Sequence, residues 1–293
     1  SYGSYNTVAI DGGMGGAIND VLSYRVSTLY QHRDDWVDNT YRGPSADGTV
    51  TPKNDTMGGY DDRNLRLQLL YKPNEQFSLL GSVHTRDYEG TSTLFLRNAL
   101  VKGSNRTDVP RDKVAFDEAD NNPQAYKTHG GSLKATYDFG NTTLTSIIAY
   151  ETTSGYSRGD TDGGAAANYP VNGLPNGYGQ SMGQVQDLDQ FTQELRLASN
   201  DTDPLSWQVG AFYFDGRDTT DFYQRAWFLD APARNPNNWV RLRNINTSWA
   251  GFGQVSWKAT DALTLTAGIR ATKDEKSTRL LKTADTAAGV VTY

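Results

Sequence analysis

The sequence predicts an all-β fold, a transmembrane antiparallel up-and-down β-barrel to which this chain contributes about ten strands. Apolar and polar residues alternate with a period of two in about ten segments. The connections between these segments alternate between short and long, as an up-and-down meander would arrange them. No segment with the periodicity of an amphipathic helix is long enough to form a stable helix, and no fixed repeat indicates a propeller or a solenoid.

The alternation gives each expected strand one apolar and one polar face. In the range 64–72, Leu65, Leu67, Leu69 and Tyr71 alternate with mostly polar positions. Successive side chains of a strand point to opposite sides of the sheet, so one side faces an apolar environment and the other faces water. The same pattern, less regular in 191–199 and 249–258, occurs in the ranges 22–31, 77–86, 132–139, 144–150, 191–199, 205–213, 249–258 and 263–270.

The connections between the expected strands separate by length. The short ones are turn-forming sequences at 72–75, 138–141, 200–204 and 259–262, with 12–20 as a slightly longer member. The long ones run roughly over 34–60, 90–126, 158–186 and 217–244. In a meander every second connection lies at the same end of the sheet, so the long loops share one end. Short periplasmic turns and long extracellular loops are typical of outer-membrane barrels, and soluble sandwiches and propellers lack this segregation.

Composition narrows the class of protein further. Hydrophobic residues make up 37% of the chain and the mean hydropathy is −0.64, and no run of about 18 apolar residues predicts a transmembrane helix. The 17 tyrosines and 6 tryptophans suit aromatic girdles at a membrane interface. A net charge of −6 argues against a nucleic-acid partner, and the absence of cysteine excludes a disulfide or a thiolate metal site.

Several strings resemble barrel segments of TonB-dependent outer-membrane receptors. The opening SYGSYNT (1–7) resembles the first barrel strand after the plug of that family, and DVLSYRVSTLYQHRDDWVDN (20–39) resembles the second. The latter departs from the family pattern where Asp35 and Trp36 stand in the places of Gly and Tyr. The most specific matches are FTQELRLAS (191–199) with PLSWQVGAFYF (204–214), followed by GFGQVSWKATDALTLTAGIRATKDEKS (251–277). The long loops match nothing in the family.

The resemblance implies an energy-coupled importer of the bacterial outer membrane, without enzymatic activity or a resident cofactor. Such a receptor has an N-terminal plug and a barrel of about 22 strands. Residues 1–293 are then expected to be a partial barrel domain, with the plug and the remaining strands outside this chain. The implied partners are outer-membrane lipid, lipopolysaccharide, and TonB with its inner-membrane energising complex, acting through the plug. The ligand would be a siderophore-iron complex, a vitamin, a glycan or a similar scarce compound.

Two other classes of protein stay open from the sequence. One is a passive outer-membrane porin or adhesin, which would lack a plug encoded upstream. The other is a soluble all-β carbohydrate-binding or hydrolytic protein, which would need no detergent.

The short motifs favour structural roles over chemistry. The stretch Asp11–Gly16 lacks the Lys-Ser/Thr and the helix that follow a phosphate loop, so we expect a flexible turn. The range 160–163 begins like a calcium loop but lacks the Glu at the twelfth position, so we expect a solvated loop tip. His32, His84 and His129 have no metal-ligand spacing and are expected to be lumen-facing polar residues. No metal site and no catalytic residue is predicted.

Ligand capture is the site hypothesis with a physical basis. Aromatic faces and guanidinium groups in the long loops suit a large polar ligand such as an anionic metal chelate or a glycan. The alternative is that these side chains only pack the loops together. The candidates are Trp36, Tyr41, Arg42, Arg158, Tyr223, Arg225, Trp227, Trp239 and Arg241. The polar lining of the lumen is expected to include Arg25, Arg66, Lys134, Glu194, Arg196 and Arg270.

Overall fold

A computed structural model describes residues 1–43, 56–96, 100–117, 119–161, 163–165, 179–200, 204–226, 237–286 and 289–292. Only the backbone is described at 119, 179–181, 223–226, 237–239, 281–286 and 289–292. These residues form one large twelve-stranded sheet and one small three-stranded sheet. No helix among them is long and apolar enough to cross a membrane.

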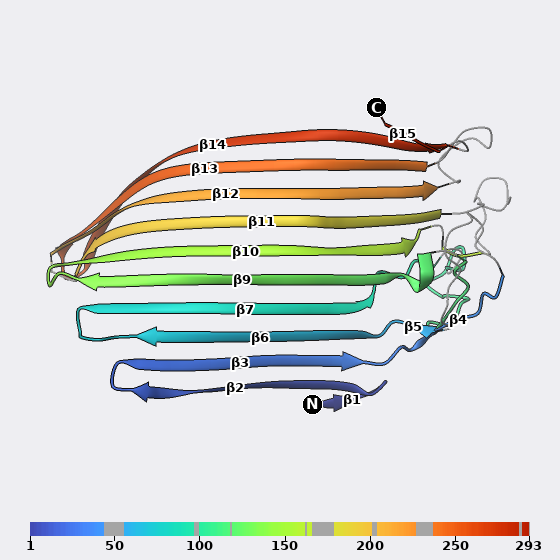
Figure 1. Cartoon of the computed structure of the whole chain (residues 1–293), viewed down its shortest axis with the longest axis horizontal. Helices are drawn as coiled ribbons and strands as arrows, with labels where there is room; N and C mark the ends of the chain where they lie inside the picture. Colours follow the sequence, from blue (N-terminus) through green and yellow to red (C-terminus); the bar gives the residue numbers. More distant parts are fainter. Residues whose placement is uncertain are drawn as a thin grey trace.

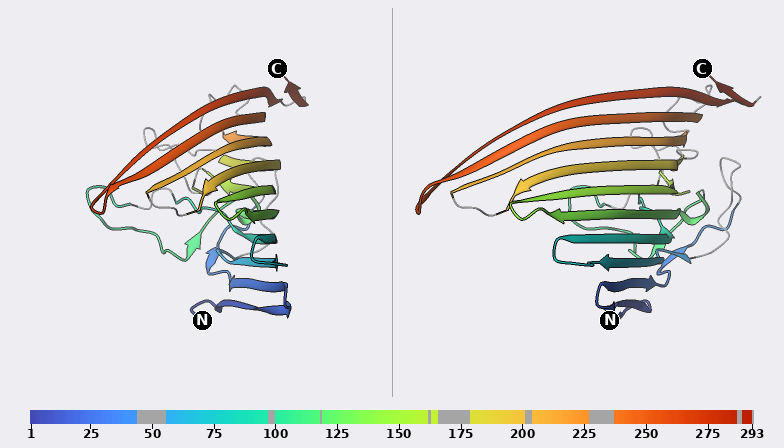
Figure 2. Two further views of the ribbon diagram at one scale, coloured as in Figure 1. Left: turned by 90° about the vertical axis from the view of Figure 1, so that its left-hand side faces the viewer. Right: turned by 60° about the vertical axis from the view of Figure 1, so that its left-hand side comes forward.

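The large sheet consists of antiparallel strands in sequential order from β1 to β15, with β4, β5 and β8 left out. Ten of its strands are long, and β1 and β15 are short strands at the two edges (Figure 1). The sheet is curved (Figure 2), and its strand order is linear. The strands are β1 (Tyr2–Gly3), β2 (Thr7–Asn19), β3 (Leu22–Arg33), β6 (Tyr60–Tyr71), β7 (Phe77–Thr91), β9 (Pro123–Asp138), β10 (Thr142–Asp160), β11 (Gly179–Ser199), β12 (Leu205–Ala226), β13 (Asn237–Thr260), β14 (Leu263–Thr286) and β15 (Gly289–Thr292).

The connections separate by length as predicted. The short turns lie together at the left-hand end of Figure 1, here called the turn end. The long connections lie at the opposite end, called the loop end. The turn after β9 contains Gly140 at φ 93°, a left-handed conformation that glycine adopts at little cost. The predicted segregation of connector lengths is therefore confirmed.

The expected turn over 12–20 is wrong, because the glycines there belong to β2. Residues Ile10–Ala17 pair in continuous antiparallel register with β3, and the turn is limited to Asp20 and Val21. Asn19 closes it by accepting hydrogen bonds from the backbone N–H groups of Val21 and Leu22, at 3.0 and 2.9 Å. A Cβ on Gly15 would lie 2.7 Å from the backbone oxygen of Tyr24, so glycine here permits close strand approach.

The strands beside the last two long loops extend further than the sequence pattern indicates. β11 begins at Gly179, β12 ends at Ala226 and β13 begins at Asn237. The backbone ladder continues there without the apolar and polar alternation, since polar cross-strand pairs replace it. Tyr223 and Trp239 are consequently strand residues, paired with each other in register.

The small sheet lies at the loop end and encloses a dry core. It joins β4 (Val37–Asn39), β5 (Thr56–Met57) and β8 (Lys113–Val114), with β4 and β8 parallel. A short 3-10 helix, η1 (Ala119–Asn121), follows. The core cluster, here called the loop core, contains Val37, Met57, Val114 and Phe116, with Trp36 and Leu94 packed against it.

The two faces of the large sheet differ as the alternation predicts. On one face Leu65, Leu67, Val209 and Leu265 are 49%, 38%, 48% and 51% exposed, and no second sheet or helix formed by the described residues covers them. We call this the apolar face. The strand register places the expected lining residues on the opposite side, here called the polar face: Arg25, Arg66, Lys134, Glu194, Arg196 and Arg270.

Candidate functional site

The apolar face ends in a row of aromatic side chains toward the loop end. The row crosses four neighbouring strands. Tyr150 pairs with Phe191 and Tyr213 pairs with Trp249, whereas Phe191 and Tyr213 are diagonal neighbours two residues apart in register. The rings of Phe191 and Tyr213 are 6.1 Å apart, and those of Tyr213 and Trp249 are 4.2 Å apart. Beyond the row the same face becomes charged. The members are Tyr150, Phe191, Tyr213 and Trp249.

A second set of aromatic side chains borders the apolar face near the turn end. Between Trp249 and Trp257, β13 advances by eight residues, or about 26 Å at about 3.3 Å per residue. At the strand tilt of about 35–45° found in outer-membrane barrels, this length corresponds to about 20 Å of height, which is close to their apolar band of about 25 Å between two aromatic girdles. The second set contains Tyr71, Tyr137, Phe139, Trp207 and Trp257.

The polar face carries a cluster of cationic and aromatic side chains toward the loop end. The guanidinium carbon of Arg33 lies 4.9 Å from the ring centre of Tyr60, and that of Arg86 lies 5.6 Å from the ring centre of Tyr88. The two tyrosine rings stack at 6.3 Å with an interplanar angle of 20°. These residues, together with Asp62, are called the arginine–tyrosine cluster.

Asp62 fixes the position of Arg86 in this cluster. Its buried carboxylate accepts hydrogen bonds from Nε and Nη2 of Arg86 at 3.0 and 2.8 Å, and from Asn64 at 2.8 Å. Arg33 is held separately, because its Nη2 donates to the backbone oxygen of Gly58 at 2.6 Å. The cluster therefore offers two fixed guanidinium groups and a pair of tyrosine rings, a set suited to planar or anionic groups.

A polar groove continues from the arginine–tyrosine cluster across the same face. Its lining includes Arg25, Arg66, His84 and Arg86, so Arg86 belongs to both groove and cluster. Glu151 reaches His84 from two strands away, with Oε1 at 2.9 Å from Nε2. The Glu151 side chain passes over Gly130. A Cβ at position 130 would lie 2.2 Å from the Glu151 carboxylate, so the glycine leaves room for this contact.

The structure separates the predicted ligand residues into different surroundings. Trp36 packs against the loop core, as the alternative of loop packing would have it. Arg42 donates to the backbone oxygens of Asn39 and Tyr41 at 2.5 and 2.8 Å. Tyr41 is also held from its backbone N–H, which donates to the Asn39 side chain at 3.2 Å. These three residues thus lie on or beside the small sheet, and their binding of ligand stays a prediction.

The other predicted ligand residues lie on or near the long hairpins. Arg158 is on β10, with Nη2 3.8 Å from the sulfur of Met182. Arg241 is on β13 and holds buried Asp221 by two hydrogen bonds at 2.7 and 3.0 Å. The backbone places Tyr223 and Arg225 on β12 and Trp239 on β13, whereas Trp227 lies outside the described residues.

Sequence reasoning missed most of the arginine–tyrosine cluster because these residues lie within strands. Arg86 and Tyr88 are two positions apart on β7, and Tyr60 and Asp62 are two apart on β6. Each pair therefore points to one face. A search for aromatic and cationic residues on the polar parity, as well as in the loops, would have found them.

Of the three histidines, which were expected to be polar residues facing the lumen, only one lies on the polar face. His84 lies on the polar face, whereas His129 shares the other side with Leu133 and accepts or donates a hydrogen bond to Thr85 at 2.9 Å. His32 is also on the apolar parity, near the loop end. There its Nε2 lies 2.9 Å from Oδ1 of Asp34. Hydrogen bonds to Asn6, the larger cause, and to His32 hold the pKa of the Asp34 carboxyl below its ordinary value.

The expectation of a solvated loop tip at 160–163 is wrong for residues 160, 161 and 163, and residue 162 lies outside the described residues. Asp160 is fully buried, and its Oδ1 accepts hydrogen bonds from the backbone N–H groups of Gly163 and Gly164 at 3.0 Å each. The Asn122 side chain accepts from the Asp160 N–H at 3.0 Å. The motif thus anchors the loop. The described residues contain no group of three or more His, Asp or Glu placed to hold a metal ion.

The fold is that of the barrel portion of outer-membrane uptake receptors, so the predicted fold class and the resemblance are confirmed at the level of fold. No protein-family model and no curated protein sequence matches the chain. Among solved structures, it is similar to the ferric yersiniabactin uptake receptor FyuA from Yersinia pestis, with a TM-score of 0.72 and 17% identity. The ferric-catecholate import receptor Fiu from E. coli K12, in its open form, matches with a TM-score of 0.66 and 12% identity.

A third similar structure is BauA, the ferric preacinetobactin receptor from Acinetobacter baumannii, with a TM-score of 0.55 and 15% identity. The matches to FyuA, Fiu and BauA cover 99%, 97% and 94% of this chain. They cover only 40%, 44% and 42% of the receptors, so the chain spans less than half of their length.

Proposed function

We propose that this chain is a barrel-wall segment of an outer-membrane receptor that imports a scarce ligand with energy supplied through TonB. The observation that carries the proposal is the difference between the two faces of one sheet. An apolar band between two aromatic borders faces lipid, and the opposite face carries a cationic, aromatic and polar groove. In this role the chain performs no catalysis and supplies a wall and part of a binding surface.

The arginine–tyrosine cluster supports an anionic, partly aromatic ligand, such as a ferric siderophore. Arg33 and Arg86 would pair with negative charge, and Tyr60 and Tyr88 would stack on planar groups. The names of FyuA, Fiu and BauA each refer to a ferric compound, which agrees with this ligand class. The loop candidates, among them Tyr41 and Arg158, would add contacts from above.

The remaining parts of the machinery are proposals drawn from the same resemblance. A plug domain and further strands, outside this chain, would complete the receptor. TonB and its inner-membrane complex would act on the plug, and lipid with lipopolysaccharide would surround the apolar band.

The proposal is tested with the whole receptor carrying Tyr60→Leu and Tyr88→Leu together. These changes keep apolar volume but remove both rings from the two guanidinium groups, so ligand affinity should fall roughly tenfold, or about 1.4 kcal/mol. The probes are 55Fe-labelled ferric catecholate and ferric hydroxamate, cobalamin and a maltooligosaccharide. Tyr137→Leu, on the apolar face, is the matched control and should leave affinity unchanged.

Two outcomes would contradict the proposed function. One is that the receptor binds none of the four probes, or that the double variant binds its probe as the wild type does. The other is that uptake persists unchanged in cells without TonB, which would support the passive porin.

A further inference from the structure

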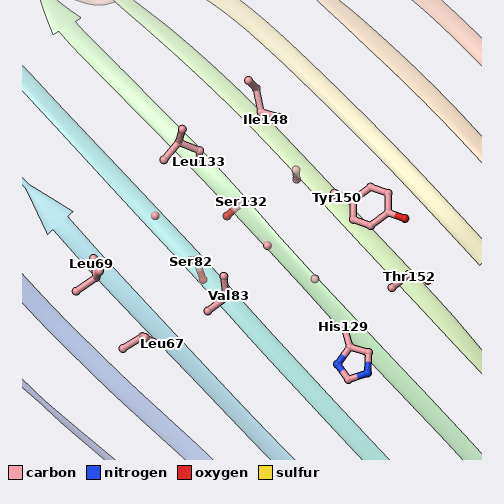
Figure 3. Close-up of a pocket in the computed structure, with 14 residues that line it drawn as sticks. Leu67, Leu69, Ser82, Val83, His129, Ser132, Leu133, Ile148, Tyr150 and Thr152 are labelled. Carbon is pink, nitrogen blue, oxygen red and sulfur yellow. The ribbon is translucent and has the colours of Figure 1, made fainter.

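Between the aromatic row and the loop end, the strands β11 to β13 reverse the polarity of their two sides. Between the two aromatic borders, apolar side chains stand on the apolar face, as Figure 3 shows for Leu67 and Leu133 on β6 and β9. Nearer the loop end, the same parity carries ion pairs. Arg243 Nη1 lies 3.2 Å from both carboxylate oxygens of Asp187. This side of the strand ends is therefore suited to water.

The opposite side of the same strand ends, on the parity of the polar face, is apolar. Phe222 pairs with Val240, and Leu242 pairs with Leu280. Phe222 and Leu280 are 46% and 59% exposed. A contiguous exposed apolar patch marks a surface that another molecule covers. We call this set the inner patch: Val185, Phe222, Val240, Leu242 and Leu280.

A bare floor and a polar border give the inner patch a defined shape. Gly183 pairs with Phe222, and a Cβ on Gly183 would meet no atom within 4 Å, so open space lies above the backbone there. On the side toward the turn end, Asn244 donates to Asp218 at 2.8 Å and accepts from Thr278 at 2.9 Å. An apolar group can therefore lie over Gly183, whereas the next row toward the turn end offers only polar contacts.

One row of paired residues joins the inner patch to the arginine–tyrosine cluster. Tyr88 and Val185 are three strand spacings apart, or about 14 Å along the sheet. Between them the Tyr126 ring leans over Gly155, where a Cβ would collide with it. A single ligand molecule can therefore contact both the cluster and the patch. The row, from β7 to β14, consists of Tyr88, Tyr126, Gly155, Val185, Thr220, Leu242 and Leu280.

We propose that the inner patch binds the apolar part of an amphiphilic ligand, an anionic chelate that carries an acyl chain. The anionic part lies at Arg33 and Arg86, and the chain crosses Tyr126 and rests over Gly183 beside Phe222. Removal of the chain and the patch from water supplies the affinity. The inference rests on the proposed function and deepens it, because it adds an apolar group to the ligand class.

The test uses the whole receptor in amphipol with ferric catecholate and ferric hydroxamate, each prepared with an acetyl and with an octanoyl group. The wild type should bind the octanoyl form at least roughly tenfold more tightly than the acetyl form. Phe222→Thr with Leu242→Thr keeps strand-forming residues but removes apolar surface. This pair should abolish the octanoyl advantage and leave affinity for the acetyl form unchanged. Gly183→Asn, which has room for its side chain, should also reduce the advantage.

Two further variants serve as controls. Ile245→Thr changes a residue on the other side of β13 and should keep the octanoyl advantage. Tyr60→Leu with Tyr88→Leu alters the anionic end of the site and should weaken both forms alike. Partition of the octanoyl form into amphipol is the same for every variant, so differences between variants report the inner patch.

Equal affinity of the wild type for the two forms would overturn the inference and leave the proposed function standing, as would an octanoyl advantage that survives in both patch variants. An equal fall in affinity for both forms in the patch variants would show that the patch only packs other parts of the receptor, which also overturns it. A receptor that binds only cobalamin or the maltooligosaccharide would likewise overturn the inference. One that binds none of the four kinds of probe would contradict the proposed function instead.

Discussion

The small sheet and the large sheet differ in whether their apolar side chains are buried. The three short strands at the loop end enclose Val37, Met57, Val114 and Phe116, each at most 5% exposed. Across the described residues of the far larger sheet, Ala250 is the one buried hydrophobic side chain. The large sheet nevertheless carries ordered rows of leucine, valine and aromatic residues on one face.

This difference indicates what surrounds each region. A sheet face that stays apolar over ten long strands would be a severe aggregation liability in water. The small sheet, by contrast, buries its own apolar side chains in the loop core. In the proposed outer-membrane setting, the large sheet takes its stability from its backbone ladder and from lipid around its apolar face.

The largest expected effect is on the loop core. Phe116→Ala should destabilise the small sheet by about 3–5 kcal/mol, because it opens a cavity in a core without access to water. Hydrogen exchange should become faster at the backbone amides of 37–39 and 113–116 and stay slow in β6. Phe95→Ala, at an exposed phenylalanine of the same loop, is the control. Equal effects of the two substitutions would show that the loop core contributes nothing.

A smaller effect is expected on the apolar face. Leu67→Arg places a charge near the middle of the apolar band and should cost about 2–4 kcal/mol of folding free energy in lipid vesicles. Gln68→Arg, one residue along on the polar face, should cost under about 1 kcal/mol, since that side faces water. Urea titration of the whole receptor in vesicles measures both. Similar losses for the two variants would remove the distinction between the faces.

The sequence predicted the large sheet well because alternation and connector length are local signals. Leu65, Leu67 and Leu69 indicate their face without knowledge of any neighbour, and the turn at 138–141 carries its own glycine. The glycines of 12–20 were misread because glycine is common both in turns and where strands approach closely, and only the pairing with β3 distinguishes the two. The ends of β11, β12 and β13 were missed because their outer parts pair without alternation.

The candidate site was harder to predict, because its members meet across strands. Arg33, Asp62 and Arg86 are separated along the chain, and only the register brings them to one face. The loop core likewise combines Val37 and Met57 with Val114 and Phe116. The parallel pairing of β4 with β8 brings them together, and no local sequence pattern indicates that pairing. The placement of Trp36 against that core depends on this pairing.

The central claim, that one face of the sheet meets lipid and the other meets water, can be measured residue by residue. Spin labels attached to single cysteines at Leu65, Arg66, Leu67, Gln68 and Leu69 of the vesicle-embedded receptor report access to oxygen in lipid and to a nickel chelate in water. This chain contains no cysteine that would compete for the label. We expect oxygen access to peak at 65, 67 and 69, and nickel access to peak at 66 and 68. Equal nickel access at all five positions would contradict the account.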